Sequence, residues 1–320
     1  MTDKLQLMFA RSLERPGPYR VAFLAILVLA PPLVAYTSTP YGPELYPIYL
    51  IAPILLGIGF RDAGPTFFVV ASLLLVFFRY ILTPYDNPHP VTLALLFCIY
   101  LLLAIMSVGL TKNYLQTKHK TLELIAALAK SLDSRDANTA SHSENAARYA
   151  LMIAEEMKLS PKMCESIYIG GLLHDIGKIG VPEHILLNPK KLSNDDFAHI
   201  KEHPSLGFHT LQHIDEFEKN GVLDIVLYHH ERYDGKGYPN GLKGEDIPLP
   251  ARIMAIADTF DAMTSNRVYR DALGLDLVVD EIRKQKGSQF DPDIADVFLT
   301  ILSRQGGHIF EYLKTYKTPF

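Results

Sequence analysis

Four long apolar runs fill the first 110 residues of this 320-residue chain, and they restrict its fold more than any other feature. The runs cover residues 20–36, 46–60, 65–82 and 91–110. A membrane-spanning helix needs about 20 apolar residues, so the fourth run is long enough alone and the others qualify with their aromatic flanks. The economical interpretation is an N-terminal bundle of four transmembrane helices.

Two other interpretations explain only part of this pattern. A cleaved signal peptide would account for the first run but not for the three that follow it. A buried core helix is the alternative for the second run, which is short and contains Pro47 and Pro53. Four spans therefore remain the main expectation, and a buried core helix remains the alternative for the second run.

Charged residues show which side of the membrane each connection faces. Residues 1–110 contain 6 Lys and Arg and 5 Asp and Glu, whereas the rest of the chain contains 25 and 30. Basic residues precede the first run, follow the fourth and include Arg61 between the second and third, but the connections 37–45 and 83–90 have none. The positive-inside rule then places both termini in the cytoplasm. This layout resembles the membrane sensor modules that precede bacterial signalling domains, and that resemblance implies a place in a bacterial inner membrane.

Composition also excludes some classes of function. The formal net charge is -4 and no basic block is present, so the chain lacks the electrostatic footprint of a protein that binds duplex nucleic acid. The two cysteines, Cys98 and Cys164, provide neither a disulfide framework nor a thiolate metal site. That usage fits a reducing cytosol for the part after the apolar runs.

Helix signals dominate after the fourth run. Apolar residues recur at helical spacing between Leu122 and Leu132, which indicates a signalling helix that leaves the membrane. Ser160 before Pro161, Ser193 before an acidic turn, and Pro250 each mark the start of a further helix. We therefore expect an all-α chain with a membrane module at 1–110, a signalling helix and linker at 111–130, and a helical catalytic domain at 131–320.

Histidines and aspartates cluster in the second part. The stretch "HHERYDGKGYP", residues 229–239, pairs two histidines beside a glycine-rich turn. Adjacent imidazoles that face one point most often bind a metal. "LLHDIGKIG" places His174 and Asp175 at a helix end, and Asp258 lies on an apolar helix face, where a buried carboxylate needs a partner or a metal.

Five separate pieces together resemble the HD-GYP family, the HD-superfamily phosphohydrolases that cleave the bacterial messenger cyclic di-GMP. The pieces are "TASHSENAARYA", "LLHDIGKIG", "KEHPSLG", "HHERYDGKGYP" and "IMAIADTFDAMTS", in the family's order and over about residues 124–298. The resemblance implies a helical HD-GYP domain with two divalent transition-metal ions, iron or manganese. It assigns one metal to His142, His174, Asp175 and Asp258, and the other to His203, His229 and His230, with Asp175 shared.

The same resemblance implies further residues for substrate and chemistry. Lys178 occupies the family's phosphate-contacting position, and Asp261 lies one turn after Asp258, where it could bond the nucleophile or a metal ligand. "DAMTSNRVYR" is similar to the family's "DALTSDRPYR". The expected substrate-binding residues are Lys178, Tyr238, Pro239, Arg267 and Arg270.

Other histidines do not match ligand positions. His199, His209 and His213 have helical spacing, yet only His203 matches a family ligand, so we expect the first three on the surface or in packing. Some family members hold a third metal with a glutamate four residues before the first ligand, and Asn138 stands there in this chain. An asparagine adds no charge, so we expect a binuclear centre, with Asp136 as the alternative ligand for a third metal.

The expected function is hydrolysis of cyclic di-GMP to linear pGpG by a membrane-anchored phosphodiesterase with its catalytic domain in the cytoplasm. Hydrolysis onward to GMP is left open. A non-catalytic receptor for cyclic di-GMP or for a protein, and a phosphohydrolase for another cyclic dinucleotide, are the alternatives. A second copy of the chain and a diguanylate cyclase-type protein are the candidate protein partners.

Overall fold

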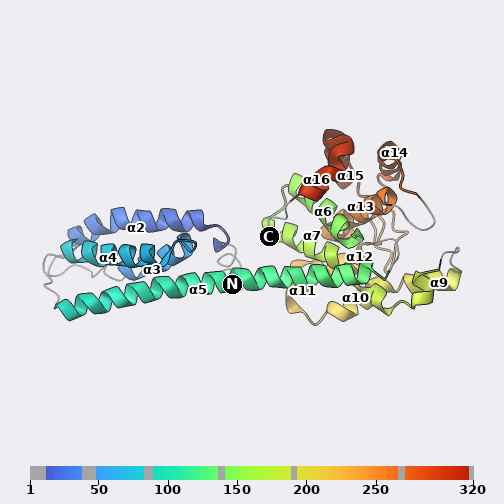
Figure 1. Cartoon of the computed structure of the whole chain (residues 1–320). Helices are drawn as coiled ribbons and strands as arrows, with labels where there is room; N and C mark the ends of the chain where they lie inside the picture. The colour runs from blue at the N-terminus through green and yellow to red at the C-terminus, as the bar shows by residue number, and fades with distance from the viewer. Residues whose placement is uncertain are drawn as a thin grey trace. The chain divides into compact units, whose positions relative to one another are not determined.

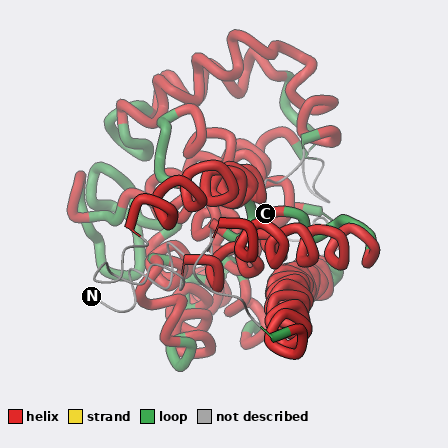
Figure 2. Tube along the Cα trace, turned by 90° about the vertical axis from the view of Figure 1, so that its left-hand side faces the viewer, coloured by secondary structure: helices red, strands yellow, loops and turns green. Residues whose placement is uncertain are grey.

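The computed structural model describes residues 12–37, 48–82, 89–135, 141–188, 193–265 and 271–316. The chain divides into two compact units, Met1–Lys120 and Thr121–Phe320. Helices make up both units, and none of the described residues belongs to a named strand (Figures 1 and 2). The prediction of an all-α fold is therefore confirmed for the described part of the chain.

Each predicted apolar run forms a helix in the first unit. The helices are α2 (Pro16–Thr37), α3 (Ile48–Gly59), α4 (Pro65–Leu82) and the first part of α5 (Pro90–Asp133). Small residues let α3 approach α5 closely, because a Cβ on Gly57 would lie 2.5 Å from the carbonyl oxygen of Ala104. Ser107 donates a hydrogen bond from α5 to the carbonyl of Ile54 at 3.0 Å. This small-residue contact is typical of helices that pack in a membrane.

Only one of the helices in the described part of the chain is both long and apolar enough to cross a membrane. That helix is α5, whereas the apolar helical stretches at 16–30, 49–59 and 65–81 are shorter. One such helix is weak support for a membrane protein, since core helices and signal sequences can have the same length and composition. The four-span bundle and its inner-membrane location therefore stay predictions.

The second unit contains the end of α5 and a series of shorter helices (Figure 1). These are α6 (His142–Glu156), α7 (Pro161–Leu173), η1 (Ile176–Gly180), α8 (Glu183–Leu186), α9 (Asn194–Ile200), α10 (His203–Leu211), α11 (Asp215–Asn220), α12 (Val222–Tyr228), η2 (Gly244–Asp246), α13 (Leu249–Thr264), α14 (Leu275–Gln285), α15 (Pro292–Gln305), η3 (Gly306–His308) and α16 (Ile309–Thr315).

Local capping signals explain where several of these helices begin. The Ser160 side chain accepts a hydrogen bond from the backbone N–H of Met163 at the start of α7. Ser193 and Asp196 form a reciprocal capping box at the start of α9. Such bonds satisfy N–H groups that have no partner inside the helix. The predicted starts of both helices are confirmed.

Helix α13 runs through the core of the second unit. Its Phe260 ring packs edge-on against Tyr149 of α6 and Phe298 of α15, with centroid distances of 4.8 and 4.9 Å. Apolar residues cover most of this helix, so Asp258 and Asp261 are set among buried side chains. Carboxylates in such a place require hydrogen-bonding, ionic or metal partners.

A glycine brings two of the ligand-bearing segments together. A Cβ on Gly177 in η1 would lie only 1.9 Å from the carbonyl oxygen of His203 at the start of α10. No residue other than glycine fits that contact without moving the backbone. The contact sets Asp175, just before η1, close to His203.

Candidate metal centre

The seven predicted ligands come together in one place. Six of them lie at a helix end or directly after one, where side chains of different helices can converge, and only Asp258 lies inside a helix. The ligands are His142 at the start of α6, His174 and Asp175 between α7 and η1, His203 at the start of α10, His229 and His230 after α12, and Asp258 in α13.

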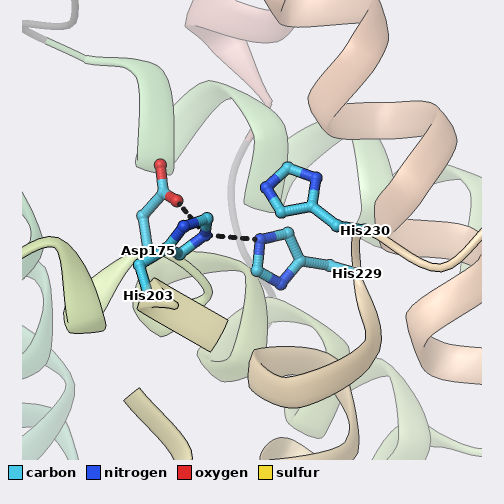
Figure 3. Close-up of side chains that lie close together, drawn as sticks. All are labelled: Asp175, His203, His229 and His230. Carbon is cyan, nitrogen blue, oxygen red and sulfur yellow. Dashed lines mark hydrogen bonds and ion pairs between the residues drawn. The ribbon is translucent and has the colours of Figure 1, made fainter. Parts of the chain in front are cut away.

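The side chains form two groups. One group is His142, His174 and Asp258, and the other is Asp175, His203, His229 and His230. Within each group the candidate ligand atoms all lie within 4.8 Å of one another. Figure 3 shows the second group, in which the Asp175 carboxylate meets the His203 ring and the His229 ring approaches His203 from another segment. Each group has the separations that allow one ion to be held.

Asp175 faces both groups. Its Oδ1 atom lies 3.2 Å from Nε2 of His203, in the second group. Its Oδ2 atom lies 3.4 Å from Nε2 of His174 and 3.9 Å from Nε2 of His142, in the first group. A carboxylate that turns one oxygen to each group could be shared between two ions, which is the role that the family resemblance implies for Asp175.

Backbone carbonyls orient three of the imidazoles. His174, His203 and His229 each bond through Nδ1 to a carbonyl oxygen about one turn earlier, at 2.7, 2.7 and 3.1 Å. A carbonyl only accepts a hydrogen bond, so Nδ1 carries the proton and Nε2 keeps its lone pair. The Nε2 atoms of these rings are therefore ready to bind a metal.

A carboxylate orients the fourth imidazole. Nδ1 of His142 lies 2.7 Å from Oδ2 of Asp261, and its Nε2 lies 3.2 Å from Oδ1 of Asp258. Asp261 itself is buried, with 2 % of its surface exposed. Of the two roles predicted for Asp261, the structure therefore supports contact with a metal ligand, His142.

Electrostatics differ between the groups. Burial alone would lower the pKa of His142, but the hydrogen bonds to Asp258 and Asp261 raise it to about 10. Burial would raise the pKa of Asp258, yet His142 and the other imidazoles hold it below its ordinary value. In the second group, burial and the neighbouring imidazole of His203 lower the pKa of His230 to about 3.

The donor set fits two divalent transition-metal ions. Nε2 of His174 is buried and has no hydrogen-bond partner within the described part of the chain. A buried nitrogen left in this state is costly unless a ligand satisfies it. Imidazoles combined with carboxylates suit iron or manganese, whereas calcium and magnesium prefer oxygen ligands. The identity of the metal stays a prediction.

Three of the predicted substrate-contacting residues border this centre. Nζ of Lys178 lies 2.5 Å from Oδ2 of Asp175. The Tyr238 ring packs against the His230 ring at a centroid distance of 4.8 Å, and Pro239 follows it through a cis peptide bond. The structure thus brings Lys178 to the shared carboxylate and Tyr238 to a candidate ligand. Arg267 and Arg270 lie outside the described residues.

The loop that follows the paired histidines is held by its own side chains. Glu231 accepts the backbone N–H of Asn240 at 2.7 Å, and Asp234 pairs with Arg232 at 3.0 Å. A Cβ on Gly237 would lie 2.4 Å from the backbone nitrogen of Arg232, so the turn folds tightly onto the ligand segment. Glu231 and Asp234 thus fix the loop through these bonds.

The remaining histidines behave as the sequence predicts. His199 has 57 % of its side chain exposed, and His209 and His213 are exposed as well. Asn138 and Asp136, which bear on a third metal, lie outside the described residues. Lys201 was not predicted, and its ammonium nitrogen lies 5.2 Å from the centre of the Tyr238 ring. Lys201 matches no motif, and its contact with Tyr238 depends on the fold, so the sequence does not indicate it.

Comparison with known proteins agrees with this geometry. The sequence profile described as "HD domain" matches residues 123–294, which is more than half of the chain. The chain belongs to the HD domain family. Its relatives among curated proteins can therefore be compared with the candidate metal centre.

Three of these relatives are phosphodiesterases by name. A cyclic di-GMP phosphodiesterase response regulator from Xanthomonas campestris pv. campestris is 40% identical over 185 residues, which cover 58% of this chain and 49% of that protein. A probable cyclic di-GMP phosphodiesterase from Vibrio cholerae serotype O1 is 37% identical, covering 55% and 43%. A 3'3'-cGAMP-specific phosphodiesterase from Vibrio cholerae serotype O1 is 36% identical, covering 56% and 41%. The chain thus spans about half of each relative or less.

Proposed function

We propose that this protein is a metal-dependent phosphodiesterase that hydrolyses cyclic di-GMP to linear pGpG. The observation that carries the proposal is Asp175, whose two oxygens face two separate groups of candidate ligands. In binuclear sites the two ions usually lie about 3.5 to 4 Å apart. Such a pair, held by these residues, would supply both Lewis acidity and a nucleophile generated from water. The names of the relatives support a cyclic dinucleotide as the substrate.

The chain's own residues would orient the ligands and the substrate. Asp261 holds the His142 ring through its Nδ1 proton, so the opposite nitrogen stays directed into the centre. Lys178 places an ammonium group beside the shared carboxylate, where it would contact a phosphate oxygen or protonate the leaving 3′ oxygen. Tyr238 would form a wall of the substrate pocket against His230. Arg267 and Arg270 are proposed to contact phosphate or guanine edges.

A second substrate is favoured by one relative. The 3'3'-cGAMP-specific phosphodiesterase from Vibrio cholerae matches this chain over a region of similar length and with similar identity. The metal ligands constrain the type of reaction more strongly than the bases of the substrate, because the metals they would hold act on phosphate. Product analysis with both cyclic dinucleotides distinguishes these substrates. A receptor without catalysis would bind either one and release no product.

The experiment uses the full chain in detergent, loaded without oxygen with iron or manganese. We expect cyclic di-GMP to be converted to pGpG and the metal-free protein to be inactive. Cleavage of 3'3'-cGAMP at a higher kcat/KM would change the assigned substrate. Binding of either dinucleotide without cleavage by protein that contains two metals would contradict the proposed activity.

We also propose that the first unit anchors the protein in the inner membrane through four spans, with the second unit in the cytoplasm. Large apolar side chains are exposed on its helices, among them Val21 (68%), Val28 (70%) and Leu110 (67%). Such exposure is unfavourable in water but ordinary toward lipid. Reporter fusions at Lys118 and Asp86 should report cytoplasm and periplasm respectively. A periplasmic signal at Lys118 would contradict the topology and the access to an intracellular messenger.

A homodimer and a diguanylate cyclase-type partner remain proposals as well. The signalling helix predicted at 111–130 falls within the continuous helix α5. Light scattering of the detergent-solubilised protein would test for the homodimer, and co-purification with a cyclase would test for the other partner.

A further inference from the structure

The end of α5 is bonded to the segment that carries the first candidate ligand. Asp133, the last residue of α5, accepts the backbone N–H of Ser143 at 3.0 Å and its hydroxyl at 2.6 Å. Both residues are buried, with 5% and 1% of their surfaces exposed. Ser143 directly follows His142, so these two bonds hold the residue next to a ligand.

Asp133 also replaces the capping group that α6 otherwise lacks. The residue before α6, Ser141, makes no side-chain hydrogen bond to the start of the helix. The N–H groups of a first helical turn have no partner inside the helix, so they need one from elsewhere. The carboxylate from α5 supplies it, and its negative charge lies at the favourable end of the α6 dipole. The start of α6, and His142 with it, is therefore located by another helix.

A second contact links the same end of α5 to the other ligand segment. Arg135 donates a hydrogen bond to the carbonyl oxygen of Ile179 at 3.2 Å. Ile179 belongs to η1, which also contains Lys178 and begins directly after Asp175. Two residues near the end of α5 thus reach the segment that carries His142 and the segment that follows Asp175.

Apolar packing is incomplete at this point. A cleft of about 170 Å³ lies beside the two bonds, and it is lined by Ala126, Ala129 and Lys130 of α5, by Ser141 and Glu144, and by Leu172. The hydrogen bonds of Asp133 therefore add a polar link to the packing of Ile125 and Ala129 of α5 in the core.

We propose that Asp133 is a positioning residue for the metal centre: it sets the place of His142 through Ser143 and thereby links the first metal to the end of α5. The proposal rests on the proposed function only in requiring that the centre binds metal. Residues that orient a ligand change metal affinity by about 10- to 100-fold when they are replaced. In the second group, His203 and His229 are instead oriented by carbonyls of their own segments.

Metal retention in the full chain tests this inference directly. Asp133→Asn keeps the shape of the side chain and removes its charge, and Ser143→Ala removes only the hydroxyl. We expect Asp133→Asn to weaken one of two bound metals by about 10- to 100-fold, and Ser143→Ala by less. Elemental analysis after dialysis against a graded series of chelator concentrations measures both metals without any activity assay.

Ser160→Ala is the matched control. It removes the side-chain cap at the start of α7, whereas His174 lies at the other end of that helix. It should lower stability while leaving both metals in place. The double variant Asp133→Asn with Ser143→Ala should lose less metal affinity than the two single losses added together, because both changes act on one contact.

Several outcomes decide the question. Recovery of full occupancy by Asp133→Asn at excess metal would support a positioning role, because the ligands themselves are intact. Retention of both metals equal to that of the wild type, or an equal loss in Ser160→Ala, would overturn it. If Asp133→Asn does not fold, Ser143→Ala carries the test alone. Wild-type protein that binds two metals but cleaves no cyclic dinucleotide would contradict the proposed function and leave this inference standing.

Discussion

The two halves of the candidate metal centre are built from different chemistry. The first half combines His142 and His174 with the carboxylates of Asp258 and Asp261. The second half relies on the imidazoles of His203, His229 and His230, two of which are oriented by backbone carbonyls. Within the described part of the chain, Asp175 is the one carboxylate in the second group. The first half therefore has two carboxylates of its own beside the His142 ring, whereas the second half has one carboxylate, which it shares.

This difference follows from the elements that carry the residues. Helix α13 crosses the core and presents Asp258 and Asp261 three positions apart, so both carboxylates reach the His142 ring from one helix face. The second half is assembled at helix ends, where carbonyl oxygens of the last helical turn accept the Nδ1 protons of His203 and His229. We infer that the first half gains affinity through charge and the second through pre-oriented lone pairs.

Asp175→Ala should have the largest effect, because it removes the one ligand common to both halves. We expect the protein to lose both metals and its hydrolytic activity together. His199→Ala is the control, since that exposed imidazole lies only four residues before His203 in sequence but takes no part in either group. Elemental analysis that finds one metal retained in Asp175→Ala would show that the halves are independent.

Gly177→Ala should disturb the second half more than the first. The added Cβ would meet the carbonyl oxygen of His203 at 1.9 Å, so η1 and α10 must separate. Overpacking of this kind costs about 1–3 kcal/mol of unfolding free energy. Denaturant unfolding of the metal-free protein measures this cost.

Gly180→Ala, in the same short helix, is the control for that change. Its Cβ would meet only the flexible end of the Leu206 side chain at 3.0 Å, and we expect little loss of stability. Equal losses in the two variants would mean that the approach of η1 to α10 has no special role.

The sequence predicts the helices of this fold better than it predicts the contacts between them. Capping residues such as Ser160 and Ser193 act on their own helices, so their consequences can be deduced locally. The ligand set followed from the order of five motifs, whereas spacing alone would have selected His199 with His203. The alignment of Asp133 with Ser143 could not be foreseen, because it depends on how two helices pack across a loop. Likewise, sequence left two roles open for Asp261, and only the geometry shows its contact with His142.

Asp261→Asn should weaken the first half alone. The amide keeps the shape of the side chain but loses the charge that stabilises the His142 ring in its ligand orientation. We expect the affinity for one metal to fall by about 10- to 100-fold while the other is unchanged. Chelator competition monitored by elemental analysis would show this as a separation of two release steps, and a uniform shift of both steps would contradict it.

The two halves should also differ in the pH dependence of their metal affinity in the unmodified protein. Although burial opposes it, Asp258 and Asp261 raise the pKa of His142 to about 10, so the metal-free first half carries a proton there at neutral pH. A metal must displace that proton, and its affinity should rise about tenfold per pH unit as the pH increases toward that pKa. In the second half, burial and nearby imidazoles lower the pKa of His230 to about 3, so this ring is already neutral. Chelator competition at about pH 6, 7 and 8 should therefore yield one steep and one shallow metal affinity, and parallel slopes would mean that the carboxylates on α13 do not distinguish the two halves.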